Sequence, residues 1–302
     1  MDNKLFTPGP LNTKLSVKEA MLHDMGSRDK EFLEVVKEIR DELLEIAGVT
    51  REEGYDAVLM QGSGTFGVES VISTALPPNG HLLLLSNGAY GDRIRQMAEI
   101  YGIKTSTLSY LENIVPPAQD VKLALKTDET ITHVAIVHCE TTNTLEACYG
   151  NARTISLNLY GQWIDIKKNN QFRFTPPIQS VLAFRKAIEE LKAEGGIEKR
   201  SERYQQNYRR LIEGTEVLGL KTYLDKKDQG YIITSFLFPE HPNFDFTLFY
   251  EKLHQRGHVI YQGKLSDTNC FRIGNIGQLY VEDIDRLLLA IQDVLTEMEV
   301  TF

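Results

Sequence analysis

The stretch Ala57-Val58-Leu59-Met60-Gln61-Gly62-Ser63-Gly64-Thr65-Phe66-Gly67 decides the fold. A short apolar run ends in Gly-Ser-Gly-Thr, and a helical pattern follows, so the sequence predicts a strand over 57–60, a tight turn and a helix over 65–75. Glycine lets the backbone turn sharply and approach a ligand closely. The free N–H groups at the start of such a helix, with the hydroxyls of Ser63 and Thr65, suit an anion, usually a phosphate. The turn is neither a Walker A loop nor Gly-x-Gly-x-x-Gly, and taken alone it is more often ordinary turn chemistry.

The following residues repeat the strand–loop–helix pattern. The continuous apolar run His81–Leu85 predicts a parallel strand that is covered on both faces, and Lys104–Leu108 and Thr132–His138 predict two more strands. Polar loops of small residues follow the strands, and ligands of open α/β sheets bind at the carboxyl ends of strands. We therefore expect three loops to converge on one site: Ser63-Gly64-Thr65, Ser86-Asn87-Gly88 and Glu140-Thr141-Thr142.

Composition narrows the class of protein. The 302 residues are 42% hydrophobic and carry a formal net charge of -9, without a basic run, which argues against a nucleic-acid partner. The three cysteines are scattered, so they indicate neither a disulfide framework nor a metal site, and reducing cytoplasm is the expected compartment. The N-terminus does not resemble a signal peptide, and no apolar run approaches the ~20 residues that cross a bilayer.

The pattern also predicts the domain organisation. We expect an N-terminal arm over 1–14, a large domain over 15–184 and a smaller α+β domain over 185–302. In the large domain, apolar residues at helical spacing predict a helix that starts after Asp29 and ends at Gly48. Residues 155–160 fit either a short strand or an amphipathic piece. A long helix is predicted from Pro177 to Lys192.

Six motifs in order make the chain resemble the 2-aminoethylphosphonate–pyruvate aminotransferases, which are close to the alanine–glyoxylate and serine–pyruvate aminotransferases. The resemblance covers nearly the whole chain, and it implies a pyridoxal-phosphate enzyme of the aspartate-aminotransferase fold, a mainly parallel sheet with a smaller C-terminal domain, that acts as a homodimer. The motifs are Leu5-Phe6-Thr7-Pro8-Gly9-Pro10, Gln61-Gly62-Ser63-Gly64-Thr65, Ser86-Asn87-Gly88-Ala89-Tyr90-Gly91, His138-Cys139-Glu140-Thr141-Thr142, Phe174-Thr175-Pro176-Pro177 and Cys270-Phe271-Arg272-Ile273-Gly274-Asn275-Ile276-Gly277.

The resemblance also implies roles for individual residues. Ser63, Gly64 and Thr65 would hold the phosphate of pyridoxal 5'-phosphate, as the turn chemistry already suggests. Tyr90 would cover the cofactor ring, Thr142 would touch the ring or its 3'-oxygen, and Thr175 would reach the phosphate of the neighbouring subunit. Arg272 would bind the phosphonate of one substrate and the carboxylate of the other, since a guanidinium fork suits both anions. Their alternatives are structural: a helix cap for Thr142, a turn residue for Thr175 and a surface ion pair for Arg272.

One part of the family pattern is missing. A lysine that forms a Schiff base with the cofactor and an aspartate that pairs with its ring nitrogen should fall between Thr142 and Cys148, where the sequence has no room for them. Roughly sixty residues, two strand–helix units, are lacking, because each crossover needs about a dozen residues or more. Neither Lys264 nor the Lys167-Lys168 pair is a good substitute.

Two explanations are open: the sequence omits a stretch that the protein has, or the polypeptide lacks it. Loss of inner strands would expose apolar sheet edges, so we favour the first. The expected function is transfer of the amino group of 2-aminoethylphosphonate to pyruvate. The alternatives are an alanine–glyoxylate or serine–pyruvate type aminotransferase and a catalytically dead scaffold of the same fold.

Overall fold

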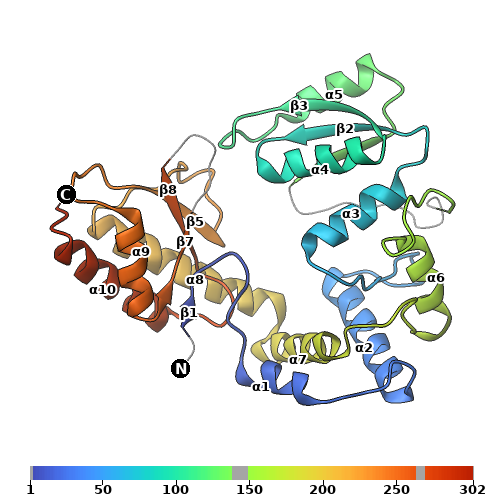
Figure 1. The fold of residues 1–302 in the computed structure, drawn as a ribbon, viewed down its shortest axis with the longest axis horizontal. Coiled ribbons are helices and arrows are strands. Elements are labelled where there is room, and N and C mark those ends of the chain that lie inside the picture. The colour runs from blue at the N-terminus through green and yellow to red at the C-terminus, as the bar shows by residue number, and fades with distance from the viewer. Residues whose placement is uncertain (1–2, 138–148, 263–268, 302) are drawn as a thin grey trace. The chain divides into compact units, whose positions relative to one another are not determined.

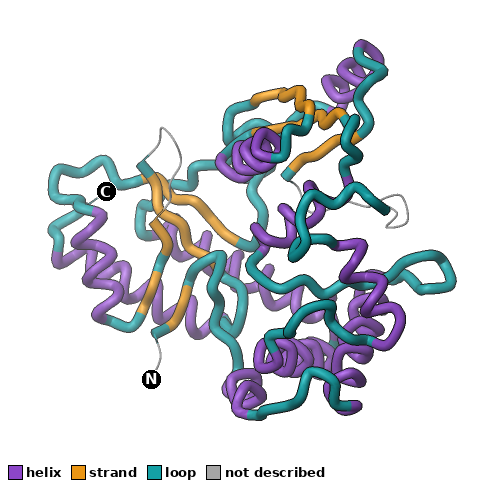
Figure 2. The backbone as a smooth tube through the Cα atoms, turned by 45° about the vertical axis from the view of Figure 1, so that its right-hand side comes forward, coloured by secondary structure: helices purple, strands orange, loops and turns teal. Residues whose placement is uncertain are grey.

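The computed structural model describes residues 3–137, 149–262 and 269–301. It divides into two compact units, which we describe separately (Figure 1). The central unit is Met21–Arg185, and the terminal unit combines Met1–Ala20 with Lys186–Phe302. Each unit contains both helices and strands (Figure 2).

The central unit contains a parallel sheet of three described strands in the order β3-β2-β4. Strand β2 (His81–Ser86) pairs with β3 (Lys104–Ser109) on one side and with β4 (His133–Ile136) on the other. All six residues of β2 are buried, as its continuous apolar run predicts. Helices α3 (Gly64–Ala75) and α4 (Ala89–Ile100) contribute to one apolar core with the sheet: Ile72, Leu76, Leu82, Leu84, Ile94, Met97, Ala98, Ile103 and Ala135.

The other helices of the central unit largely follow the predicted pattern. Helix α2 (Lys30–Ala47) ends at Gly48, which has a φ of 68° that favours glycine. Helix α5 is Ala118–Thr127, and α7 (Ile178–Glu194) continues from the central unit into the terminal unit. Residues 159–160, predicted as part of a short strand or amphipathic piece, instead open helix α6 (Leu159–Asn169), because Asn158 caps it by accepting a hydrogen bond from the Gly161 N–H at 2.8 Å.

The strand predicted over Ala57–Met60 does not form among the described residues. A strand needs a neighbour for its backbone hydrogen bonds, and β2, β3 and β4 pair with one another but not with this segment. Side chains bind its carbonyl groups instead. The Arg40 Nε donates to the Ala57 oxygen at 3.0 Å, and the Gln162 Nε2 donates to the Leu59 oxygen at 3.0 Å.

The terminal unit has an antiparallel sheet in the order β5-β8-β7. Its strands are β5 (Ile233–Leu237), β7 (Tyr261–Gln262) and β8 (Cys270–Gly274). Helices α8 (Gly196–Val217), α9 (Phe246–Gln255) and α10 (Val281–Glu297) pack with the sheet (Figure 1). The unit also holds the short helix α1 (Leu15–Glu19), and a 3₁₀ turn follows at Ala20–Leu22.

The first residues belong to the terminal unit rather than forming a separate arm. Strand β1 (Lys4–Leu5) pairs in parallel with β6 (His258–Val259). Phe6 is 0% exposed and lies in the core with residues of α8, β5, α9, β8 and α10. The apolar side chain at position 6 and the strand pairing before it explain the difference from the expected arm. No described helix is long and apolar enough to cross a membrane.

Candidate active site

The glycine-rich turn forms an open cradle at the start of α3. Gly62 has a φ of 120°, and a Cβ on it would lie 2.6 Å from the Cγ of Phe66, so the turn requires glycine here. Ser63 is the N-cap residue, yet its side chain makes no capping bond and is exposed. The first N–H groups of a helix lack intrahelical partners. Ser63, Gly64 and Thr65 therefore offer two hydroxyls and several backbone donors to one anion.

Helix α4 places a second group of side chains beside this cradle. The Nη1 of Arg93 donates to the Thr65 hydroxyl oxygen at 3.2 Å, and its guanidinium carbon lies 5.1 Å from the centre of the Tyr90 ring. Thr65 and Tyr90, predicted from separate motifs, are thus brought together by one arginine. Arg93 was not among the site residues predicted from the sequence. Its position three residues after Tyr90, on the same face of a helix, was the available signal.

A further hydrogen bond joins α3 to α4. The Tyr101 hydroxyl at the end of α4 donates to the Glu69 carboxylate of α3 at 2.6 Å. Burial and the neighbouring Glu69 carboxylate raise the pKa of Tyr101 to about 12, since both disfavour the phenolate. The relative position of the two helices is therefore set by polar contacts as well as by the apolar core.

The Phe174–Pro177 motif also reaches the cradle segment. The side-chain amide of Gln61 donates to the Thr175 carbonyl oxygen at 2.9 Å. Thr175 itself is exposed, so its hydroxyl is accessible. The structure thus brings together three of the predicted motifs, those that contain Ser63, Tyr90 and Thr175.

Arg272 lies in the terminal unit, in the middle of β8. It is opposite Ser235 of β5 and Tyr261 of β7, and its side chain is partly exposed. Among the described residues no carboxylate lies within ion-pair distance of it, in contrast to the structural alternative of a surface ion pair. The N-terminal motif runs past the same strand, because the Gly274 N–H donates to the Phe6 carbonyl at 2.9 Å. The first and last predicted motifs are therefore neighbours.

Some predictions fall on residues that are not described. Thr142 lies outside the described ranges, as do Lys264 and the Asn143–Leu145 stretch where the lysine and aspartate are missing. Lys167 and Lys168, which the sequence analysis set aside as substitutes for the Schiff-base lysine, are exposed, and the Lys167 ammonium lies 4.4 Å from the centre of the Trp163 ring. This contact gives Lys167 a packing role.

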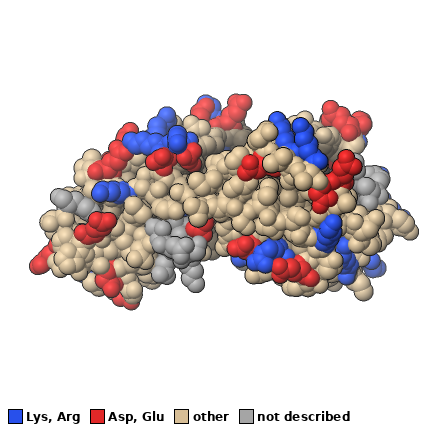
Figure 3. All heavy atoms as spheres, turned by 90° about the horizontal axis from the view of Figure 1, so that it is seen from above, with Lys and Arg blue, Asp and Glu red and all other residues tan. Residues whose placement is uncertain are grey.

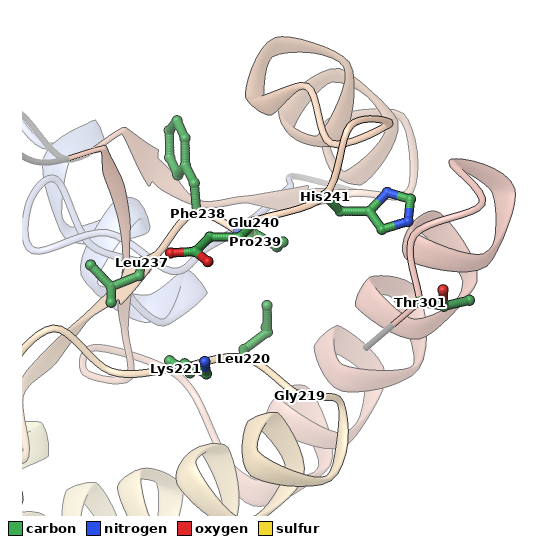
Figure 4. Close-up of a pocket in the computed structure, with 9 residues that line it drawn as sticks. All are labelled: Gly219, Leu220, Lys221, Leu237, Phe238, Pro239, Glu240, His241 and Thr301. Atoms are coloured by element: carbon green, nitrogen blue, oxygen red, sulfur yellow. The ribbon is translucent and has the colours of Figure 1, made fainter.

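The surface has two other features that bear on function. A pocket of about 550 Å³ lies in the terminal unit (Figure 4), and none of the predicted site residues lines it; its lining is Gly219, Leu220, Lys221, Leu237, Phe238, Pro239, Glu240, His241 and Thr301. On the face shown in Figure 3, acidic and basic side chains are interspersed rather than gathered by sign. That face offers no basic patch of the kind that binds nucleic acid.

Comparison with curated proteins finds relatives that match almost end to end. The 2-aminoethylphosphonate–pyruvate transaminase of Salmonella heidelberg is 38% identical, and the match covers 98% of this chain and 98% of that protein. The Vibrio cholerae protein of the same name is 39% identical over 95% of this chain and 96% of its own length. No family model matches the chain.

The length of the first of these matches bears on the missing stretch. The match to the Salmonella heidelberg protein runs over 362 positions, whereas this chain has 302 residues. At least 60 positions of the match, the difference between those two lengths, therefore have no residue of this chain opposite them. This agrees with the size of the stretch that the motifs indicate is lacking.

Solved structures confirm the predicted fold. A ureidoglycine–glyoxylate aminotransferase from Bacillus subtilis superposes with a TM-score of 0.85 at 18% identity, covering 98% of this chain and 94% of that one. An alanine–glyoxylate aminotransferase from Nostoc sp. gives 0.83 at 20% identity, covering 98% and 96%. These likenesses show an α/β aminotransferase fold, in agreement with the parallel sheet of the central unit.

Proposed function

Because the chain belongs to the 2-aminoethylphosphonate–pyruvate transaminase family, we propose that it moves the amino group of 2-aminoethylphosphonate to pyruvate. The products are phosphonoacetaldehyde and alanine. The observation that carries this proposal is the end-to-end identity with proteins of that name.

The cradle fits the phosphate of pyridoxal 5'-phosphate. Ser63 and Thr65 supply hydroxyls, Gly64 and the start of α3 supply N–H groups, and Gly62 leaves space that a side chain would fill. When bound, this cofactor draws electrons from the substrate carbon next to nitrogen. Tyr90 is 63% exposed and is available to cover the ring. We assign Thr142 to the ring on the family pattern alone.

Arg272 is proposed as the anion-binding residue for both substrates. Its guanidinium lacks a carboxylate partner among the described residues. The planar guanidinium can donate paired hydrogen bonds to the oxygens of a phosphonate or of a carboxylate. On the family pattern, Thr175 would reach the phosphate of the neighbouring subunit, so we propose a homodimer. Within one chain the Thr175 carbonyl oxygen accepts from Gln61, which leaves the exposed Thr175 hydroxyl for that contact. The scattered cysteines suit a cytoplasmic protein.

The proton-transfer lysine and the aspartate for the ring nitrogen would lie in the stretch that the sequence lacks. Two features of the central unit indicate where that stretch would fit. Ala57–Met60 has no strand partner among the described residues, and β4 has only β2 beside it, with Val134 left 41% exposed. Both features are expected where neighbouring strands are missing.

The dead-scaffold alternative is tested by the mass of the protein purified from its source. A mass near 34.3 kDa means that the stretch is truly lacking, and it would overturn the proposed enzyme. A mass greater by roughly 6–7 kDa, which corresponds to the two lacking strand–helix units, supports it.

The substrate is tested by half-reactions of cofactor-loaded protein with 2-aminoethylphosphonate and with serine. Faster conversion with the aminophosphonate supports the proposal. Faster conversion with serine would place the chain with the serine–pyruvate type instead.

A further inference from the structure

Arg93 is placed in the cradle without an ion partner. It is exposed, it donates to the Thr65 hydroxyl at 3.2 Å, and among the described residues no carboxylate lies within ion-pair distance of it. Arg95, two residues along the same helix, differs: its Nη1 lies 2.7 Å from Glu99 and its Nε lies 3.9 Å from Asp92. One arginine of α4 is therefore neutralised by its own helix, and the other is directed to the predicted phosphate site.

The hydrogen bond from Arg93 fixes what the Thr65 hydroxyl can do. Because its oxygen accepts from the guanidinium, the hydroxyl proton points away from Arg93 and is available to another acceptor. Hydrogen bonds in a chain polarise one another, so a hydroxyl that accepts from a cation becomes a better donor. An anion at the start of α3 would be the acceptor of this stronger bond.

Tyr90 limits where the guanidinium can go. The Arg93 carbon lies 5.1 Å from the Tyr90 ring centre, within the range of a cation–π contact. The ring therefore holds the charge beside Thr65 rather than leaving it to move freely in solvent. The first turn of α4, which carries Tyr90, packs closely against the end of β2, since a Cβ on Gly91 would lie 2.8 Å from the Ser86 Cα.

We propose that Arg93 is a positioning residue for the phosphate group of the cofactor: it orients and polarises the Thr65 hydroxyl and adds a positive charge to the cradle at the start of α3. This inference rests on the proposed function and adds to it a residue that the sequence motifs do not assign.

The test measures binding rather than turnover. Dissociation constants of the full-length protein, with the stretch that this sequence lacks, are measured by equilibrium dialysis for pyridoxal 5'-phosphate and for pyridoxal, which lacks the phosphate. The variants are Arg93→Gln and the matched control Arg95→Gln, which removes the same charge from the same helix. Urea unfolding of both variants is measured alongside.

The inference expects a loss that is specific to the phosphate. Arg93→Gln should raise the dissociation constant of pyridoxal 5'-phosphate by about three- to tenfold, a modest effect because the charge is exposed. The dissociation constant of pyridoxal should not change. The effect should shrink as salt is raised. Arg95→Gln should change neither constant.

Two other outcomes separate the inference from the proposed function. Suppose that the wild-type chain binds pyridoxal 5'-phosphate more tightly than pyridoxal. If Arg93→Gln then keeps that preference, or weakens the binding of both ligands equally, the role of Arg93 is refuted and the cofactor site stands. If the wild-type chain binds pyridoxal 5'-phosphate no more tightly than pyridoxal, the phosphate cradle itself is refuted, and the role of Arg93 with it.

Discussion

The substitution Arg40→Met tests how the cradle is attached to the rest of the central unit. The Arg40 side chain is 4% exposed and donates to both carboxylate oxygens of Asp56 at 2.7 Å. It also donates to the Ala57 oxygen, the Ile166 oxygen and the Asn170 side chain, at 3.0, 3.2 and 2.6 Å. One side chain of α2 thus holds both α6 and the segment that leads into the phosphate turn.

The expected loss of stability follows from burial. Removing one partner of a buried ion pair costs about 3–5 kcal/mol, because the other charge stays buried and uncompensated. Asp56 is 11% exposed and keeps hydrogen bonds from Trp163 at 3.0 Å and Arg51 at 3.4 Å, so we expect a value near the lower end, about 3 kcal/mol. With an m value of about 2 kcal/mol per M of urea, the midpoint should fall by about 1.5 M.

Urea unfolding followed by tryptophan fluorescence measures this effect locally. Trp163 is the only tryptophan of the chain, it is 6% exposed, and its indole N–H binds Asp56, so the signal reports on the central unit. The control is Arg51→Gln, which also removes a contact to Asp56, but from a side chain that is 40% exposed. That change should cost about 0–1 kcal/mol. Equal midpoints for the two variants would refute the buried-network argument.

Three further predictions concern the cradle, its helix pair and the N-terminal strand. Gly62→Ala should destabilise the central unit by about 1–3 kcal/mol and weaken pyridoxal 5'-phosphate, because the φ of 120° and the clash with Phe66 strain the turn; an unchanged urea midpoint and affinity would contradict this. The raised pKa of Tyr101 adds stability that is present below pH ~10 and is lost as the pH rises through about 12; Glu69→Gln should shift that phenolate titration to lower pH in an ultraviolet absorbance measurement, and an unmoved titration would argue against the pair. Phe6→Ala should cost about 3–5 kcal/mol in the terminal unit, seen as faster hydrogen exchange in β6 and β8, whereas unchanged exchange would mean that the N-terminal residues are not part of its core.

The sequence was sufficient where local chemistry decides the structure. The apolar run His81–Leu85 predicted a doubly covered parallel strand, and Gly48 predicted the end of α2. Prediction from the sequence failed where a segment's structure depends on a neighbouring strand. Ala57–Met60 has strand composition, but a strand exists only when a neighbour completes its hydrogen bonds, and none of the described strands does so. Helix α6 was not predicted, because residues 155–160 fitted a short strand or an amphipathic piece, whereas Asn158 caps a helix that starts at Leu159.

The same distinction applies to the candidate site. Ser63, Gly64 and Thr65 are predicted as an anion site because the first N–H groups of a helix suit anions, and the structure places all three at the start of α3. The contact of Arg93 with Thr65 was not predicted, because it depends on α3 and α4 lying side by side; the sequence shows only that Arg93 follows Tyr90 by three residues. The anion role of Arg272 is a proposal that rests on the family pattern and on the lack of a carboxylate partner among residues 3–137, 149–262 and 269–301.

The pairing of β1 with β6 has a consequence for synthesis in the cell. The ribosome makes Phe6 early, but the residues that surround it in the core begin at Leu211 and extend to Val300. The terminal unit therefore cannot finish folding before nearly the whole chain has emerged, whereas the intervening unit, Met21–Arg185, is complete much sooner. Until those residues are made, Phe6, which is 0% exposed in the folded unit, lacks the side chains that bury it.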